Sequence, residues 1–146
     1  VLAGELISGG RLFLDPLVDL DRSSDINLGL LDRLSNPRPA FHAVRCLNTI
    51  VFGTAEEYLP VAVENISGGR LLGLSAPTRL LWLLLPEGEM SVDPAALEGL
   101  VSEGHRIWSF DLAAGTSRDL TGDDKELNRA LSRVDRPTLL MSALSE

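Results

Sequence analysis

The sequence lacks several features that identify common protein classes. It has 146 residues with a single cysteine, Cys46, and neither a Cys-x-x-Cys nor a His-Glu-x-x-His spacing. An intrachain disulfide framework is therefore excluded, and we expect neither a metal site nor a cofactor from a known motif. One cysteine leaves the redox compartment open, and with it the cellular location.

Basic residues and long apolar runs are also scarce. The chain has 13 Lys and Arg against 21 Asp and Glu, for a formal net charge of −8, and its basic residues are scattered. Nucleic-acid binding needs clustered Lys and Arg to contact phosphates, so we expect no nucleic-acid partner. The longest apolar run, Leu80 to Leu85, is far shorter than the roughly 20 residues of a membrane-spanning helix, so no membrane span is expected.

The composition of the chain indicates a folded protein. With 45% hydrophobic and 23% charged residues, it is long enough for one ordinary domain or two small units with a shared core. Its start has neither a basic stretch before an apolar segment nor an initiating Met, which predicts no signal peptide and is typical of a fragment or processed product.

Two parts of the chain with different residue patterns meet near Thr54 to Pro60. Residues 1–53 have the pattern of a helix end, a short strand at Arg11 to Leu14, a long loop, and a helix over Asn36 to Phe52. Residues 54–146 hold short apolar runs separated by Gly, Pro and Asp, which is typical of strands. We therefore expect two units, 1–53 and 54–146.

The sequence of residues 54–146 predicts strands and one helical segment. The expected strands are Pro60–Ile66, Arg70–Ser75, Arg79–Leu85, His105–Leu112, Ser117–Thr121 and Pro137–Ala143. Val92 to Glu103 has helical content, with Asp93 as N-cap and Gly104 as the stop. Trp82 and Trp108 lie in strand patterns, where a core role is favoured over sugar stacking. This number of strands suffices for a small antiparallel sandwich.

The loop from Leu17 to Ser35 carries the densest carboxylates. Four residues match the first, third, fifth and seventh positions of a calcium-binding EF-hand loop: Asp19, Asp21, Ser23 and Asp25. Ser24 stands where Gly is required, and Leu30 where the bidentate Glu belongs, so calcium is disfavoured. A solvated or pocket-rim loop whose Asp residues cap turns or form ion pairs is favoured. Direct contact with a hydroxyl-rich ligand stays an alternative.

The helix over Asn36 to Phe52 has an unusually wide apolar surface. Pro39 marks its first turn, where the missing N–H costs nothing. At 100° per residue the apolar residues cover two adjacent sides: Phe41, Val44, Leu47 and Val51, then Ala43, Cys46 and Ile50. This width predicts burial against more than one layer. His42 is expected on the exposed polar edge, and Cys46 as a small core residue rather than a nucleophile.

Residues Gly29 to Arg45 read GLLDRLSNPRPAFHAVR. They resemble the phrase G-L-hydrophobic-D-x-x-x-x-P-[RK]-P-A-[FY]-x-A that follows the eighth strand in clan A glycoside hydrolases, a superfamily of (β/α)₈ barrels. The direct matches are Gly29, Leu30, Asp32, Pro37, Arg38, Pro39, Ala40, Phe41 and Ala43. The later region is similar to the β-sandwich that follows such barrels in β-xylosidase-like and α-L-iduronidase-like members, with matches at Phe110-Asp111-Leu112, Gly115 and Pro137 to Met141.

The resemblance implies an α+β chain: the last strand and helix of a (β/α)₈ barrel, then a small antiparallel β-sandwich. It implies hydrolysis of glycosidic bonds by two glutamates at the ends of the fourth and seventh strands. Both strands would precede Val1, so no catalytic residue is assigned here. Glu5 is rejected because it lies too close to Arg11 for a parallel crossover, which needs roughly a dozen residues. Whether the parent is an active enzyme stays open.

Asp15 and Asp19 are the candidate substrate-binding residues. Asp15 ends the strand that the resemblance makes the eighth of a barrel, and barrel chemistry lies at that face. A turn role for Asp15 is the alternative, and Phe13 and Leu14 stand where many members place a Trp beneath the sugar. The expected partners are a carbohydrate, through the parent barrel, and the remainder of that barrel. Two other functions compete: a degenerate barrel for carbohydrate binding or polysaccharide assembly, and an independent β-sandwich interaction module.

Overall fold

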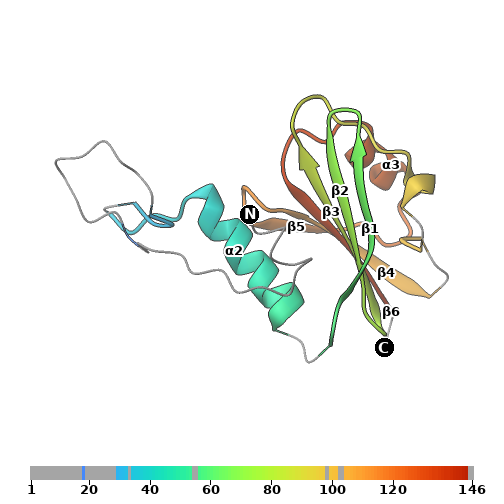
Figure 1. Ribbon diagram of the computed structural model, residues 1–146, viewed down its shortest axis with the longest axis horizontal. Helices are drawn as coiled ribbons and strands as arrows, with labels where there is room; N and C mark the ends of the chain where they lie inside the picture. Colours follow the sequence, from blue (N-terminus) through green and yellow to red (C-terminus); the bar gives the residue numbers. More distant parts are fainter. Residues whose placement is uncertain are drawn as a thin grey trace.

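The computed structural model describes residues 18, 29–32, 34–53, 56–97, 99–101 and 104–144. Within these ranges the chain forms helix α2, Pro39–Leu47, which continues as a short π-helix, η1, Asn48–Phe52. An antiparallel sheet follows, with six strands in the order β1-β2-β3-β6-β4-β5 (Figure 1). The strands are β1 Leu59–Ile66, β2 Gly69–Ser75, β3 Arg79–Pro86, β4 His105–Asp111, β5 Thr116–Asp119 and β6 Thr138–Leu144.

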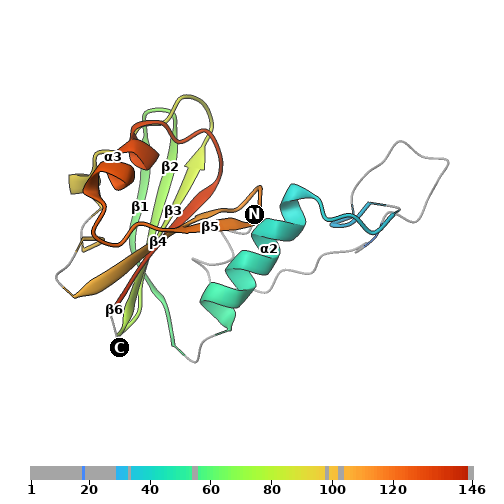
Figure 2. The same ribbon diagram turned by 180° about the vertical axis from the view of Figure 1, so that it is seen from behind.

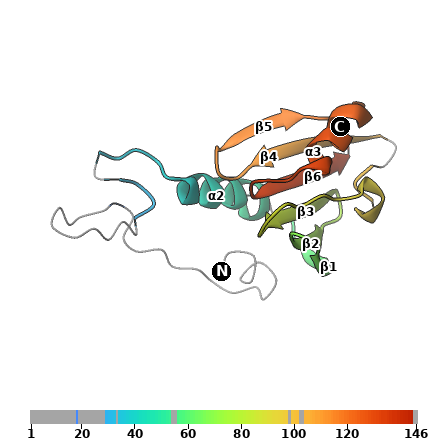
Figure 3. The ribbon, with the colours of Figure 1, turned by 90° about the horizontal axis from the view of Figure 1, so that it is seen from above.

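Two short helical elements connect the strands. The 3₁₀ turn η2, Pro94–Ala96, lies between β3 and β4, and helix α3, Asp124–Ser132, lies between β5 and β6. None of the helices in the described ranges is long and apolar enough to cross a membrane. Figure 3 shows β6 lying between β3 and β4, so the last strand of the chain joins the β1-β2-β3 and β4-β5 hairpins into one sheet.

The apolar run in β3 is buried on both faces of the sheet. Side chains alternate along a strand, so Trp82 and Leu84 point to one face while Leu81 and Leu83 point to the other. Each set joins a separate core cluster. This explains why β3 is apolar at nearly every position and occupies an interior place in the sheet.

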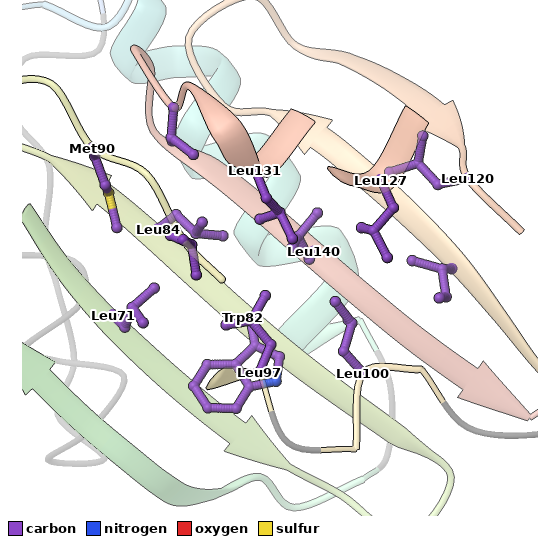
Figure 4. Packing of buried hydrophobic residues seen from close by; sticks show 13 residues of the cluster. Leu71, Trp82, Leu84, Met90, Leu97, Leu100, Leu120, Leu127, Leu131 and Leu140 are labelled. Carbon is purple, nitrogen blue, oxygen red and sulfur yellow. The ribbon is translucent and has the colours of Figure 1, made fainter. Parts of the chain in front are cut away.

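One face of the sheet is covered by α3 and η2 (Figure 4). Leu127 and Leu131 of α3, together with Leu97 and Leu100 beside η2, pack on Trp82 and its neighbours. The opposite face is covered by α2 and η1, whose Leu47, Ile50 and Val51 are buried against the sheet. Figure 2 shows α2 and α3 on opposite sides of the sheet. The sheet is therefore sandwiched between helices.

The α+β class and the antiparallel strands are confirmed, whereas the two-sheet β-sandwich is wrong for the described residues. All six strands belong to one sheet, because β6 pairs with both β3 and β4. Each face of that sheet buries its apolar side chains against helical segments, which removes the need for a second sheet. The expected barrel strand, Arg11 to Leu14, and the helix end before it lie outside the described residues.

Two elements between the strands differ from the expectation. The sequence predicts a helix within Val92 to Glu103, but the described residues of this range form one 3₁₀ turn, because Leu97 leaves the helical region with φ −95° and ψ 70°. The predicted cap is confirmed: the Asp93 carboxylate accepts a hydrogen bond from the backbone N–H of Ala95. Helix α3 was not predicted, although Asp123 caps it by accepting from the N–H of Glu126.

Candidate functional site

Asp32 organises the turn that leads into α2. Its Oδ1 accepts hydrogen bonds from the backbone N–H groups of Leu34 and Asn36, both at 2.8 Å, and its Oδ2 accepts from Nδ2 of Asn36 at 2.9 Å. These bonds, with the Asn36 side chain first among them, lower the pKa of the Asp32 carboxyl. The helix then begins at Pro39, three residues after the predicted start at Asn36. Asp32, the carboxylate in the motif Gly29 to Arg45, therefore stabilises the turn before α2.

Helix α2 packs against the sheet and against the turn between β4 and β5. Cys46 lies half-buried beside the cluster that contains Leu47 and Leu81, which confirms its expected core position, and burial raises the pKa of its thiol. His42 differs from the expectation of an exposed edge. Its Nδ1 is buried because the turn at Gly115 reaches over α2, and it has no hydrogen-bond partner among the described residues. Phe41 and Val44 are only half-buried, so the predicted second layer over α2 stays a prediction.

A cavity of about 650 Å³ lies on the α3 side of the sheet, beside β1. We call it the β1 cavity. Its walls come from β1, the end of the β2-β3 hairpin, the segment around η2, and the ends of β4 and β6. The lining residues are Val61, Ala62, Glu64, Ser75, Ala76, Pro77, Thr78, Arg79, Leu80, Trp82, Ala95, Ala96, Gly99, His105 and Leu144. A volume in this range suits a small ligand or a few side chains of another molecule.

Small residues on β1 and β2 leave room for the β1 cavity. Ala62 pairs with Gly73, which pairs in turn with Trp82, so two of the three residues in this row across the sheet have little or no side chain. The indole of Trp82 occupies part of the gap: a Cβ on Gly73 would lie 3.0 Å from Cζ3 of the ring and 2.9 Å from Cγ2 of Val61. Larger residues in this row would close the cavity.

Trp82 forms the inner wall and belongs to the core, as the sequence predicts. Only 4% of the residue is exposed, so its ring offers little surface on which a sugar could stack. Its Nε1 is buried without a hydrogen-bond partner in the described part of the chain. Figure 4 shows the nitrogen on the edge of the ring that faces away from Leu71.

Most polar groups around the β1 cavity already have partners. Nδ1 of His105 lies 2.9 Å from Oγ of Ser142, and Ser142 is completely buried, so this pair satisfies a core hydroxyl and cannot present a nucleophile to a substrate. Glu56 accepts hydrogen bonds from the N–H and hydroxyl of Thr78, and Nε of Arg79 lies 3.6 Å from its second oxygen. Glu64 is exposed, and its side chain makes no hydrogen bond or ion pair with another described residue.

The second tryptophan lies on the other face of the sheet. The guanidinium carbon of Arg106 stands 4.8 Å from the ring centroid of Trp108, and the same guanidinium forms an ion pair with Asp119. Hydrogen bonds from Thr121 and then from Arg106 lower the pKa of Asp119 to about 2. Arg106 thus covers one side of the ring that a sugar would need.

Asp15 and Asp19, the predicted substrate-binding residues, both lie outside the described residues. Within the described ranges, no three His, Cys, Asp or Glu side chains come together in a group that could hold a metal ion. The β1 cavity was not predicted. Its only sequence signal is the small size of Ala62, Gly73 and Ser75, which acquires meaning once the strand register places them together.

Comparisons with protein-family models, with curated proteins and with solved structures found no match to this chain.

Proposed function

We propose that this chain is the non-catalytic C-terminal portion of a glycoside hydrolase that acts on a poly- or oligosaccharide. In this proposal the two catalytic glutamates lie upstream of Val1, and residues 1–53 supply the last strand and helix of a (β/α)₈ barrel. The proposal rests on the segment Gly29 to Arg45, which resembles the closing segment of such barrels.

One observation in the structure supports this proposal. The matched residues form a continuous structural unit: Asp32 holds the turn, Pro39 opens α2, and Ala43 packs toward the sheet. A barrel-closing helix followed by an accessory sheet needs this arrangement. Phe41 and Val44, which continue the apolar surface of α2 beyond Leu47, are only half-buried, and we propose that the barrel covers them.

The proposal is tested by hydrolysis assays on two proteins. The first is this chain, and the second is the same chain preceded by its upstream coding region. Both are incubated with a panel of fluorogenic aryl glycosides and with polysaccharides, and released product is measured. We expect hydrolysis only from the longer protein, because glycosidic cleavage needs a pair of carboxyl groups on either side of the bond.

A matched control replaces each strand-end glutamate of the upstream region with glutamine. Hydrolysis should then fall by several orders of magnitude while the protein stays folded. Hydrolysis by the 146-residue chain alone would refute the proposal, as would an upstream region that encodes no barrel. A folded barrel that binds oligosaccharide without cleaving it would instead identify the degenerate, carbohydrate-binding alternative.

A second candidate, an independent interaction module, is favoured by one feature of the core. The cluster that includes Trp82, Leu127 and Leu140 is built from residues after the expected boundary at 54, without any contribution from α2. If residues 56–146 alone unfold cooperatively in urea with native-like stability, the module is supported. If they unfold without a cooperative transition, the sheet depends on α2, as the glycoside hydrolase proposal requires.

A further inference from the structure

Strand β1 is an open edge of the sheet. It pairs with β2 on one side, and within the described ranges no strand lies on its other side. From Ala62 to Ile66 it pairs with β2 in regular antiparallel register, after a bulge between Pro60 and Ala62. Alternate residues of an edge strand direct their backbone N–H and C=O groups outward, where they can pair with another chain.

The two edges of the sheet differ in chemistry. The opposite edge, β5, has four residues, Thr-Ser-Arg-Asp, all exposed, and two of them are in ion pairs: Arg118 with Glu126 and Asp119 with Arg106. Short, charged edge strands resist pairing with other chains. In contrast, β1 is eight residues long and displays Leu59 and Val61, which are 61% and 54% exposed. The edge at β1 is therefore the one suited to pairing.

The β1 cavity lies directly beside this edge. Val61, Ala62 and Glu64 of β1 form part of its lining, as does the exposed Leu144 at the end of β6. Four of the five large hydrophobic residues that are exposed within the described ranges belong to this end of the sheet or to the segment after η2: Leu59, Val61, Val101 and Leu144. An added strand whose side chains alternate would direct every second one toward the cavity.

The charge at the edge favours a basic partner. The arginines nearest to it are paired, Arg70 with Glu87 and Arg79 with Glu56, whereas Glu64 is exposed and makes no such contact with the described residues. The net charge of −8 also opposes pairing between two copies of the same chain. A segment that carries Lys or Arg next to apolar residues is complementary to this edge.

We infer that β1 and the β1 cavity together bind an extended peptide segment of a partner protein, which adds as a strand along Ala62 to Ile66. Backbone hydrogen bonds to the edge supply affinity, an apolar side chain enters the cavity, and a basic side chain pairs with Glu64. This surface lies on the face opposite to α2, so the inference does not depend on the proposed function.

The test uses defined peptides and the full 146-residue chain. A fluorescein-labelled (Lys-Thr-Val-Thr)₂ peptide, which in an extended strand carries Lys and Val on the same face, as Glu64 and the β1 cavity are on the same face of the sheet, is titrated with the protein by fluorescence anisotropy. The bound site is mapped from the amide shifts of ¹⁵N-labelled protein. We expect saturable binding, with shifts in β1 and none in β5. Peptides (Lys-Thr-Ser-Thr)₂ and (Glu-Thr-Val-Thr)₂ should bind more weakly, because the first has no apolar side chain for the cavity and the second repels Glu64.

Two matched controls separate strand addition from charge attraction. In one (Lys-Thr-Val-Thr)₂ peptide the backbone nitrogens of Lys and Val are methylated, and in another the backbone nitrogens of Thr. One of the two should bind about tenfold more weakly or worse, because only one set of N–H groups faces β1. Glu64→Gln should weaken (Lys-Thr-Val-Thr)₂ binding roughly two- to fivefold, as expected for an exposed ion pair. Ser75→Leu, which fills the cavity, should abolish the preference for Val over Ser.

Several results would overturn the inference. They are the absence of saturable binding up to about 1 mM peptide, equal binding of both methylated peptides, and shifts confined to β5 or α2. Sedimentation velocity supplies a further outcome: a dimer that forms through β1 and that the peptide fails to dissociate would identify a second copy as the occupant.

Discussion

The imidazole of His42 on α2 lies directly against Gly115 in the turn between β4 and β5. A Cβ on Gly115 would come within 2.5 Å of Nδ1 of His42, and Gly115 has a φ of +69°, which residues with a side chain rarely adopt. This contact joins the helix of the first expected unit to the sheet of the second. The two units therefore share an interface in which a glycine is required.

The substitution Gly115→Ala should destabilise the protein by about 1–3 kcal/mol, because it combines a strained backbone conformation with a collision. Urea unfolding followed by circular dichroism measures the change. Gly88→Ala is the matched control, since nothing lies within 4 Å of a Cβ at that position. Adding His42→Ala to Gly115→Ala should recover the part of the loss that comes from the collision. Equal stabilities of the two glycine variants would contradict the prediction.

A second prediction concerns the core beneath α3. Leu140 of β6 is fully buried, whereas Leu144 of the same strand is 53% exposed. Leu140→Ala should cost about 2–5 kcal/mol of unfolding free energy, because the removed methyl groups leave a cavity. Leu144→Ala, the same substitution at an exposed site, should stay within about 0.5 kcal/mol of the native protein. A loss below about 1 kcal/mol for Leu140→Ala would place Leu140 outside the core.

The low pKa of Asp119 predicts how acid acts on the sheet edge at β5. Hydrogen bonds from Thr121, then from Arg106, lower this pKa from 3.8 to about 2. The charged carboxylate thus stabilises the folded state above pH 4 or so, and this contribution is lost as the pH falls toward 2. Asp119→Asn should be less stable than the native protein at neutral pH and lose less stability in acid.

The titration of Asp119 can be followed directly by NMR of its carboxyl carbon. Thr121→Val removes the hydroxyl that lowers the pKa most, so the midpoint should move up toward the ordinary value. A native midpoint already near 3.8 would contradict the geometry of this turn.

A third type of measurement tests the burial of Cys46. Burial raises the pKa of its thiol, and the nearby Arg45 offsets only part of this effect. Because the thiolate is the reactive form, Cys46 should react with a disulfide reagent at least about tenfold more slowly in the folded protein than after unfolding in urea. Equal rates in the two states would mean that α2 does not pack against the sheet as described.

Much of the strand pattern was predictable, because it depends on local chemistry. The predicted and observed bounds agree within two residues for most strands, such as Arg79–Leu85 against Arg79–Pro86. Gly68, with a φ of +84°, marks the turn between β1 and β2. Helix α3 escaped prediction because Asp124 to Ser132 has only two buried leucines, Leu127 and Leu131, among polar residues. Its helical pattern becomes clear once the sheet beneath it is known.

The candidate binding site could not be predicted. Ala62, Gly73 and Ser75 are unremarkable small residues in the sequence, and their gap exists because the strand register places them side by side under η2. The exposed edge at β1 likewise follows from the topology, since β6 enters the interior of the sheet and leaves β1 at the margin. The sequence had instead directed attention to Asp15 and Asp19, which lie outside the described residues.

The segment Gly29 to Arg45 contains both features that follow from the sequence alone and features that depend on the tertiary structure. The sequence by itself determined that Asp residues hold turns in the loop before α2, that Pro39 lies in the first turn of the helix, and that α2 has a wide apolar surface. Hydrogen-bonding capacity, the fixed φ of proline and helical periodicity are local properties. Only the tertiary structure decided which surface α2 covers and that Gly115 packs against His42. It also decided that the six strands form one sheet and not the predicted two-sheet sandwich. These outcomes depend on contacts between residues far apart in the chain, which local patterns do not specify.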